Sequence, residues 1–579
     1  MVYEFVKQAK ECGVDVFRVF DSLNYVENLK VGIDAVLKAG GICEAAICYT
    51  GDVLNKKEKT FNLDYYVKLA RELVDLGVHI LAIKDMAGLL KPMAARALVA
   101  ALRKNFPNVP IHVHTHDTAG TGVASMLECV NAGADIVDAA IDSMSGMTSQ
   151  PSMGAIVNAL RFSDTESELD PENLSHLNEY WRCVWCPDAG CVLAFSFVAS
   201  YSHFPSLFLL VNRQTRLLYA PFETNLKSGS SDVYLHEMPG GQYTNLMFQS
   251  SCLGLADQWE EVTKAYQQAN ELLGNIPKVT PSSKVVGDLA QFMVANKLDA
   301  QAVRDNANKL SFPTSVVGYF LGELGIPPNG FPQPLADDIR KGKQPVSGRP
   351  GAGLPAVDFD EVISTLEKKR IKSKITILDA LSYILYPEVY EEFLQGQALY
   401  GKNISSLPTR YFLRALEQDT ELCIELAHGK VAYIELVAVS ASSGGKREVF
   451  FTVNGNTQIV VVESEDEAAQ VVKREKAKPG QLGSVGSPMA GQLVEIRVSE
   501  GQFVSEQDPL VVLSAMKMET IVGSPIQGRV KRVEVVMGDS VNQGDLLVEI
   551  EPVDGGEAEA LSRLGSNPSI IQAVQSKQT

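Results

Sequence analysis

The sequence is poor in cysteine and in positive charge, and each shortage excludes a class of protein. Nine cysteines among 579 residues, an odd number, do not make a disulfide framework, so we expect a reducing compartment. The 52 lysines and arginines are outnumbered by 70 aspartates and glutamates, which gives a formal net charge of −18. Because phosphate binding needs a basic surface, this balance argues against a nucleic-acid partner.

An apolar leader is also missing from the start of the sequence. Neither a charged stretch followed by an apolar one nor an Arg- and Ser-rich transit segment opens it. We therefore expect a chain that is cytosolic or that lacks its true N-terminus. Hydrophobic residues make up 45% and charged residues 21% of the sequence, which is typical of a soluble globular protein, so we expect no membrane partner.

The N-terminal third alternates strand-like and helix-like patterns. Five strand-like stretches each end in polar residues and a Gly or Ser turn, and they lie at 14–22, 42–51, 79–88, 111–120 and 134–143. One strand in roughly 30 residues, with an amphipathic helix between strands, is typical of parallel βαβ units. Polar strand ends suit a (β/α) barrel, whose chemistry lies at the carboxyl ends of its strands. A closed barrel needs eight strands, so residues 1–170 predict a partial TIM-type barrel within a multidomain α/β protein.

The middle of the chain predicts two further domains and a tether. Residues 214–346 are mostly helical in pattern and would extend the barrel domain, whereas residues 347–472 read as helices followed by strands, a mixed α+β domain with an Asn-Gly hairpin turn. Residues 473–486 are charged and then rich in Pro and Gly, which is typical of a flexible linker. Residues 552–579 form a polar tail that we expect to be disordered.

The last domain contains an internal repeat. Residues 487–513 align without gaps on residues 524–550, so that Pro488 matches Pro525 and Gly501 matches Gly538. Two such halves can bury their alternating apolar faces against each other, which predicts an all-β sandwich over 487–551. Lys517 lies between the halves, at the predicted hairpin tip. An exposed lysine on a tethered domain suits covalent attachment of a carrier group, although most surface lysines are merely solvated.

Three of the eight histidines fall within "IHVHTHDT". Alternate residues of a strand point to the same face, so we expect His112, His114 and His116 to point the same way. Imidazoles that converge at the end of a barrel strand predict a metal site, and the alternative is a polar strand end with satisfied histidines. Lys84 ends the preceding strand, where partial burial would lower its pKa and make it reactive. The alternative for Lys84 is an ion pair with Asp85.

Two resemblances extend these predictions. "AMKM" around Lys517 is the signature of a biotin acceptor, and residues 484–551 resemble the biotin-carrier (biotinyl/lipoyl) family. The resemblance implies biotin bound covalently to Lys517 by a biotin protein ligase. The motifs "VFRVFDSLN", "AAICYTGD", "IKDMAGLLKP", "HVHTHDTAG", "DSMSGMTSQPSMG", "PGGQYTNL" and "KVTPSSKVVGDLAQFM" resemble the carboxyltransferase domain of the pyruvate carboxylase family.

The second resemblance implies a set of site residues. In that family the lysine of "KDMAG" is carbamylated and binds a divalent metal, Mn or Zn, together with the last two histidines of "HxHTH". These positions are Lys84, as N6-carboxylysine, His114 and His116 here. The family's proton shuttle corresponds to Thr280, and its biotin pocket corresponds to Ser283 and Lys284.

The function implied is transfer of a carboxyl group from biotin to pyruvate, giving oxaloacetate, as the C-terminal part of an ATP- and biotin-dependent ligase of gluconeogenesis and anaplerosis. Thr280 would relay a proton from the pyruvate methyl group to the biotin ureido nitrogen, and the metal would ease the charge of the enolate. Residues 347–472 correspond to the family's tetramerisation and allosteric domain, which implies a homo-tetramer for the full-length form. The family also implies the mitochondrial matrix in a eukaryote and otherwise the cytoplasm.

The sequence departs from the family at its N-terminal side. The ATP-using half and the first three barrel strands are missing, and with them an aspartate that binds metal and an arginine and a glutamine that hold pyruvate. Two alternatives therefore stay open: a subunit of a biotin-dependent oxaloacetate decarboxylase or transcarboxylase, and a non-catalytic biotin-bearing fragment. "HTHDTAG" and "GQYTNL" favour pyruvate carboxylase over the first alternative.

Residues 182–213 are foreign to both resemblances. The segment holds three of the nine cysteines, Cys183, Cys186 and Cys191, and one of the three tryptophans. Its apolar part, 192–211, contains a histidine, a proline and four serines, which weakens a membrane span, and a zinc site would lack its fourth ligand. We interpret the segment as a translated intron or gene-model error.

Overall fold

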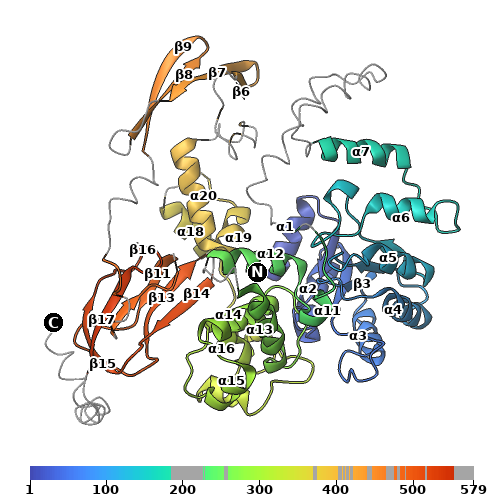
Figure 1. Cartoon of the computed structure of the whole chain (residues 1–579). Helices are drawn as coiled ribbons and strands as arrows, with labels where there is room; N and C mark the ends of the chain where they lie inside the picture. Colours follow the sequence, from blue (N-terminus) through green and yellow to red (C-terminus); the bar gives the residue numbers. More distant parts are fainter. Residues whose placement is uncertain are drawn as a thin grey trace.

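The computed structural model describes residues 1–552 with internal gaps (Figure 1). The residues that it does not describe are 184–225, 227, 253–257, 370–373, 402–406, 408–410, 412–415, 417–420, 440–445, 464–474, 479–480, 482, 490, 516–517 and 553–579. The predicted insert at 182–213 lies almost wholly outside the described residues, as do Lys517 and the C-terminal tail.

A five-stranded parallel sheet forms the N-terminal part, with its strands in chain order, and it is a partial TIM-type barrel. The strands are β1 (Val16–Val19), β2 (Ile42–Cys48), β3 (Ile80–Lys84), β4 (Ile111–His114) and β5 (Ile136–Val137). Each of the five predicted stretches contains one of them, so that prediction is confirmed. Strands β2, β3 and β4 are largely buried, whereas the edge strands β1 and β5 are more exposed.

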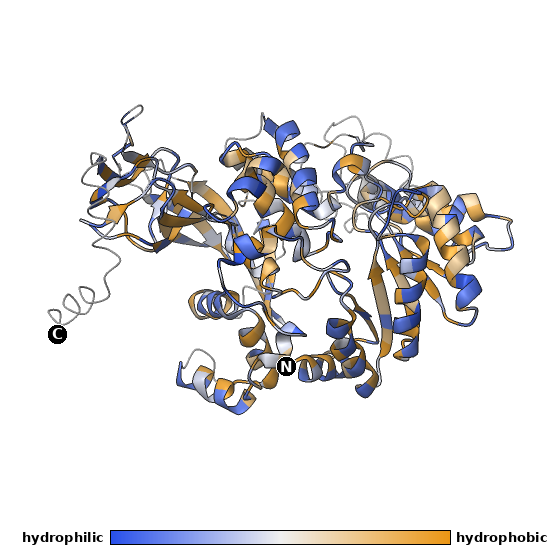
Figure 2. Ribbon diagram, turned by 90° about the horizontal axis from the view of Figure 1, so that it is seen from below, coloured by the Kyte–Doolittle hydropathy of each residue, from blue (hydrophilic) through white to orange (hydrophobic). Residues whose placement is uncertain are grey.

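Helices between the strands cover the sheet (Figure 1). They are α2 (Val26–Lys38), α3 (Leu63–Asp75), α4 (Pro92–Asn105) and α5 (Gly122–Asn131). Helix α1 (Val2–Glu11) precedes the first strand, and the 3-10 turn η1 (Asp142–Met144), α6 (Met153–Leu160) and α7 (Pro171–Cys183) follow the last. Helix α3 begins where the Asn62 side chain accepts a hydrogen bond from the Tyr65 N–H, and α4 begins with Pro92 in its first turn. Aliphatic side chains of α2–α5 pack on the sheet in one core. Figure 2 shows the strands as mainly hydrophobic and the covering helices with hydrophobic and hydrophilic sides.

A helical extension follows the barrel and packs around its own core. Its helices are α11 (Val233–His236), α12 (Gly240–Cys252), α13 (Trp259–Leu272), α14 (Ser282–Ala295), α15 (Ala300–Asn306), α16 (Thr314–Phe320) and α17 (Leu335–Arg340). The fully buried rings of Tyr266, Tyr319 and Phe320 fill this core, and Leu23, from the loop after β1, joins it. The extension is therefore anchored at the carboxyl end of the first strand.

Short helices and an open sheet make up the mixed part of the chain. The elements are the 3-10 turn η4 (Pro350–Gly353), helices α18 (Phe359–Lys368), α19 (Ile377–Leu385) and α20 (Pro387–Tyr400), and strands β6 (Glu421–Ala427), β7 (Lys430–Val439), β8 (Lys446–Val453) and β9 (Asn456–Glu463). The strands pair antiparallel in chain order. Asn454 and Gly455, between β8 and β9, have φ of 50° and 79°. These left-handed values are those of the tight hairpin turn that the Asn-Gly pair predicts.

The C-terminal part is a β-sandwich built from the repeat. Its strands are β10 (Ser484–Gly486), β11 (Gly491–Ile496), β12 (Phe503–Val504), β13 (Pro509–Ala515), β14 (Met518–Gly523), β15 (Gly528–Val533), β16 (Ser540–Val541) and β17 (Leu546–Pro552). Strands β11, β12 and β13 have counterparts β15, β16 and β17 that each begin 37 residues later. The counterparts lie in opposite sheets, β10-β17-β15-β12 and β14-β13-β11-β16, so the predicted sandwich of two halves is confirmed.

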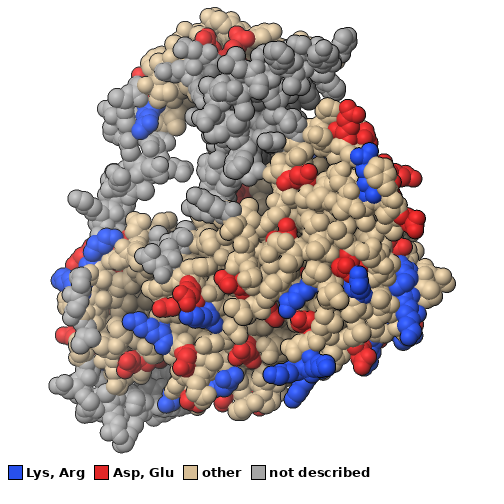
Figure 3. All heavy atoms as spheres, turned by 45° about the vertical axis from the view of Figure 1, so that its right-hand side comes forward, with Lys and Arg blue, Asp and Glu red and all other residues tan. Residues whose placement is uncertain are grey.

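The surface carries charges of both signs. Figure 3 shows lysine and arginine side chains interspersed with aspartate and glutamate on the face turned to the viewer. Within the part of the chain that the structure describes, no helix is both long enough and apolar enough to cross a bilayer. The stretch 192–211 lies outside that part.

Candidate active site

Lys84 and His114 end neighbouring strands and lie opposite each other in the parallel register of β3 and β4. The backbone continues the pairing for one residue, because the Asp85 N–H donates to the His114 carbonyl oxygen over 2.9 Å. Parallel strands present their carboxyl ends at one edge of a sheet. The predicted proximity of the lysine to the histidines is therefore confirmed.

The Lys84 side chain is half-buried beside the end of β1. Burial lowers the pKa of its ammonium, and the ammonium lies 4.9 Å from the centroid of the Phe20 ring. Asp85, the alternative ion-pair partner, is fully buried and accepts hydrogen bonds from four backbone N–H groups, of Ala87 through Leu90, and from the Thr115 hydroxyl. The alternative of an ion pair between Lys84 and Asp85 is wrong, because the Asp85 carboxylate is hydrogen-bonded to the loop after β3 instead.

His114 and His116 lie next to each other, with ring centroids 5.3 Å apart and ring planes at 80°. His114 Nδ1 is 2.7 Å from Asp138 Oδ2, and His116 Nδ1 is 2.7 Å from the Thr148 carbonyl oxygen. Both partners are acceptors, so each Nδ1 carries a proton, and in the neutral form of each ring Nε2 is the atom that holds the lone pair. Burial lowers the pKa of His116, which favours its neutral form.

Two glycines allow the backbone to close on His116. A Cβ at Gly88, whose φ is +81°, would lie 2.6 Å from the His116 carbonyl oxygen. A Cβ at Gly240 would lie 2.9 Å from His116 Nδ1 and 2.8 Å from the Thr148 carbonyl oxygen. The Gly240 N–H donates to the Met86 carbonyl oxygen over 3.0 Å. The start of "GGQYTNL" therefore packs directly on the imidazole.

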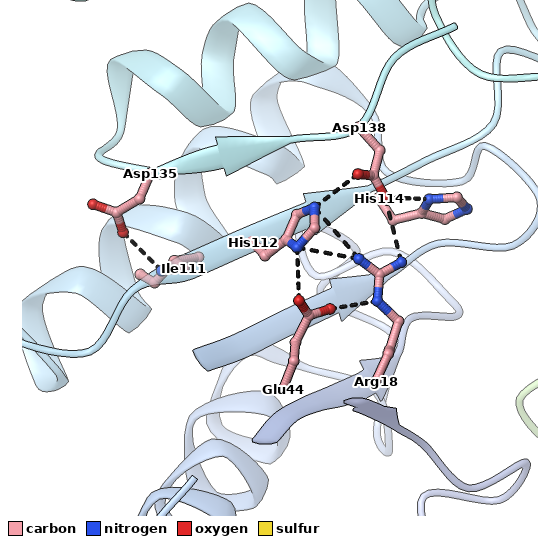
Figure 4. A network of polar contacts seen from close by, with 7 residues as sticks. All are labelled: Arg18, Glu44, Ile111, His112, His114, Asp135 and Asp138. Atoms are coloured by element: carbon pink, nitrogen blue, oxygen red, sulfur yellow. Dashed lines mark hydrogen bonds and ion pairs between the residues drawn. The ribbon is translucent and has the colours of Figure 1, made fainter. Parts of the chain in front are cut away.

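His112 points toward Glu44, Arg18 and Asp138, and both of its ring nitrogens are engaged there (Figure 4). Its Nδ1 is 2.9 Å from Glu44 Oε2 and its Nε2 is 2.8 Å from Asp138 Oδ1. Burial disfavours the imidazolium, but the hydrogen bonds to Asp138 and Glu44 outweigh it and raise the pKa of His112 to about 9. His112 and His114 share one side of β4, as predicted. The strand ends at His114, however, so His116 reaches the site from the following loop.

Asp138 joins His112 to His114. Burial raises its pKa, but the hydrogen bonds from the two histidines lower it well below its usual range, so Asp138 is ionised. Sequence reasoning missed Asp138, although its place directly after a strand was a signal. It also missed Glu44, which reads as one polar residue within an apolar strand.

Thr280 is exposed on the loop that leads into α14. The preceding Val279 is buried against Cys48 at the end of β2 and Met86 after β3. Ser282 is fully buried, and its Oγ lies 2.7 Å from the Pro277 and Val279 carbonyl oxygens and 3.2 Å from that of Ser22. The helical extension therefore holds Thr280 over the same strand ends that carry Lys84.

An ion pair between a buried lysine and a partly exposed glutamate supports this loop. Lys278 Nζ is 2.7 Å from Glu237 Oε2 and 3.2 Å from Thr50 Oγ1, and only 2% of the lysine side chain is exposed. The pKa of Glu237 is lowered by Lys278 against the opposing effect of burial. Sequence reasoning missed this pair, which joins residues far apart in the chain.

Ser283 and Lys284 belong to the first turn of α14 and differ in exposure. Ser283 is buried and its N–H donates to the Val279 carbonyl oxygen. Lys284 is half-exposed, with its ammonium 3.7 Å from Asp288 Oδ2. The predicted contact of both residues with biotin stays a prediction.

The hairpin predicted to accept biotin is described on both sides of its tip. Ala515, at the end of β13, pairs with Met518, at the start of β14. Met516 and Lys517, between them, lie outside the described residues. Thr520–Gly523 of β14 face Asp288, Gln291 and Phe292 of α14 across a cavity of about 540 Å³. The sandwich therefore lies beside the helix that follows Thr280.

Three family models match the chain in succession. They are described as "HMGL-like", for residues 4–180, "Conserved carboxylase domain", for residues 233–435, and "Biotin-requiring enzyme", for residues 483–550. The chain is 48% identical over 555 residues to "Pyruvate carboxylase 1" of Caenorhabditis elegans, across 95% of this chain and 44% of that protein. It is 45% identical over 528 residues to "Pyruvate carboxylase, mitochondrial" of Mus musculus, across 90% of this chain and 42% of that protein.

A solved structure agrees with the architecture. The carboxyl transferase domain of Rhizobium etli pyruvate carboxylase, with pyruvate and biocytin, matches with a TM-score of 0.70 and 42% identity, across 80% of this chain and 73% of that one. The chain spans less than half the length of the curated relatives.

Proposed function

The chain belongs to the pyruvate carboxylase family, and on that premise we propose that it transfers a carboxyl group from biotin to pyruvate, giving oxaloacetate. One observation carries the proposal. Lys84, His114 and His116 gather at the carboxyl ends of β3 and β4, and the loop bearing Thr280 packs on the same strand ends. A reactive lysine, two imidazoles with free nitrogens and an exposed hydroxyl are thus available at one edge of the barrel.

We propose a divalent metal, Mn or Zn, bound by Lys84, His114 and His116. The donor set fits, because both imidazoles keep Nε2 free and burial of Lys84 favours the neutral amine that reacts with CO2 to form a carbamate. Among the described residues no group of three or more His, Cys, Asp and Glu fits a metal, so the third donor proposed here is the carbamate oxygen. When bound, the metal would supply a Lewis acid that eases negative charge on the pyruvate oxygen.

Thr280 is the proposed proton carrier. Thr280 is exposed while Val279 and Ser282 on either side are fixed against the barrel, so the backbone that bears the hydroxyl has a set position. Proton transfer through a positioned side chain contributes about 100- to 10,000-fold to rate. Ser283 and Lys284, in the next turn, are the proposed biotin pocket.

The carrier domain supplies the biotin. We propose attachment at Lys517 by a biotin protein ligase, because this lysine falls between the paired strands β13 and β14. For the full-length form we propose a homo-tetramer, and for a eukaryotic chain the mitochondrial matrix, where the name of the mouse relative puts that protein.

Carboxybiotin and pyruvate, added to the purified full chain, test the proposal. We expect oxaloacetate, read as NADH oxidation by added malate dehydrogenase, and we expect Thr280→Ala to lower the rate by at least about 100-fold. A biotinylated chain that makes no oxaloacetate would instead favour the non-catalytic, biotin-bearing alternative.

A further inference from the structure

Four charged side chains from β1, β2, β4 and the end of β5 form a network beside His114 (Figure 4). Arg18 of β1 pairs with Glu44 of β2, and both contact His112 of β4. Asp138, directly after β5, closes the network. Its Oδ1 is 2.8 Å from His112 Nε2, and its Oδ2 is 3.3 Å from Arg18 Nη1.

Asp138 is the member of this network that also reaches a proposed metal ligand. Its Oδ2 is 2.7 Å from His114 Nδ1. An ionised carboxylate only accepts hydrogen bonds, so this contact keeps the His114 proton on Nδ1 and the lone pair on Nε2. Contacts with Arg18 and His112 fix both oxygens of the carboxylate, so the acceptor itself has little freedom to move.

We propose that Asp138 is a positioning residue that sets the tautomer and ring orientation of His114 for binding a divalent metal. The inference rests on the metal site put forward above. The Nδ1 proton of His116 is held in the same way by the backbone carbonyl oxygen of Thr148. No side-chain substitution removes that acceptor. Carboxylates that accept the second N–H of a ligating histidine typically affect metal affinity by about 10- to 100-fold.

A purely structural role of Asp138 predicts a different result from a positioning role. Substitution of Glu44 distinguishes the two roles. Glu44 is the other carboxylate of the network, it contacts the same Arg18 and His112, and it is the more buried, with 4% of its side chain exposed against 30% for Asp138. It lies on β2 and bonds to His112 rather than to His114. If loss of charge balance is what matters, Glu44→Gln should lose at least as much metal affinity as Asp138→Asn. If loss of His114 positioning is what matters, only Asp138→Asn should lose metal affinity.

The test measures metal affinity on the full chain in bicarbonate buffer. Wild type, Asp138→Asn and Glu44→Gln are loaded with Zn²⁺ or Mn²⁺, and affinity is read by chelator competition and elemental analysis, with Co²⁺ absorption as the report on ligand geometry. We expect Asp138→Asn to bind about 10- to 100-fold more weakly than wild type and to change the Co²⁺ spectrum, with Glu44→Gln within about 3-fold. Equal losses in the two variants would overturn the inference but leave the metal site standing.

Two further outcomes are decisive. If the wild-type chain binds none of the three metals, the proposed metal site fails and the role of Asp138 fails with it. If Asp138→Asn does not fold, Asp138→Glu and Glu44→Asp provide a second pair, each keeping its charge and moving it by one methylene. A larger loss of affinity in Asp138→Glu than in Glu44→Asp supports the inference, and equal or reversed losses overturn it.

Discussion

At the scale of single residues, the site depends on close approaches that one added atom would disturb. Gly240 touches His116, and its neighbour Gly241 faces open space. Alanine substitutions at these two adjacent positions therefore distinguish crowding of the His116 imidazole from a general effect of alanine on α12.

We predict that Gly240→Ala weakens binding of Zn²⁺ by the full chain, because the new Cβ would lie 2.9 Å from His116 Nδ1 and must displace the ring. Overpacking of this kind also costs about 1–3 kcal/mol of stability. Chelator competition and thermal unfolding measure the two effects. Gly241→Ala is the control, and equal loss of metal in both variants would contradict the prediction.

His236 gives a second prediction at this scale, on pH. The residue is buried, and burial lowers its pKa to about 4, against 6.5 in the unfolded chain. Below pH 6.5 the unfolded chain therefore binds a proton that the native chain does not, so stability falls as pH drops from 6.5 toward 4. Linkage gives a loss of about 2 kcal/mol at pH 5 from this residue.

We expect His236→Asn to remove this part of the acid sensitivity, since an amide oxygen can still accept the Met238 N–H that His236 Nδ1 accepts. Urea unfolding at pH 7 and pH 5 measures the effect as the change in midpoint for each variant. His428→Asn, at an exposed position, serves as the control. Unchanged acid sensitivity in His236→Asn would show that the buried imidazole is not its source.

At the scale of elements, the position of the α14 loop depends on the ion pair between buried Lys278 and partly exposed Glu237. We predict that Lys278→Met costs about 1–3 kcal/mol, because the Glu237 carboxylate, whose side chain is 28% exposed, loses its charged partner. The double variant Lys278→Met, Glu237→Gln should regain most of that loss, since no uncompensated charge remains. Urea unfolding measures both.

The exposed pair of Lys264 and Glu260 in α13 is the matched control for the pair of Lys278 and Glu237. Lys264→Met should cost no more than about 0.5 kcal/mol, as is usual for exposed pairs one helical turn apart. A cost for Lys278→Met as small as this would contradict the prediction and mean that water compensates the Glu237 carboxylate for the lost ammonium.

The elements themselves could be predicted from local pattern, whereas contacts between them could not. The βαβ rhythm and the 37-residue repeat are periodic in the sequence, and both appear in the structure. The bond between His114 and Asp138 depends on how β4 and β5 are aligned, and the packing of Gly240 on His116 depends on where the helical extension returns to the barrel. Such distances arise from tertiary packing, so the place of Asp138 directly after a strand marks it as a candidate but does not say which histidine it meets.

At the scale of the whole molecule, the proposed metal site and the proposed carrier domain lie at opposite ends of one polypeptide. The partial barrel holds the proposed metal ligands, and the sandwich holds the proposed biotin acceptor about 400 residues later in the sequence. Among the residues that the structure describes, the cores of the two units share no side chains, because one is built from the parallel sheet with its helices and the other from β10–β17. Changes at the acceptor should therefore leave the barrel intact.

We predict that Lys517→Arg abolishes biotinylation yet leaves Zn²⁺ affinity and transfer from free carboxybiotin to pyruvate unchanged. A blot with labelled streptavidin, chelator competition and the malate dehydrogenase assay measure the three effects. Lys531→Arg, on the adjacent half of the same sandwich, should keep its biotin, because β15 bears that lysine away from the hairpin that joins β13 to β14. If Lys517→Arg also loses transfer from free carboxybiotin to pyruvate, the barrel needs the tethered biotin even when free carboxybiotin is present. The barrel and the sandwich would then not act as separate parts.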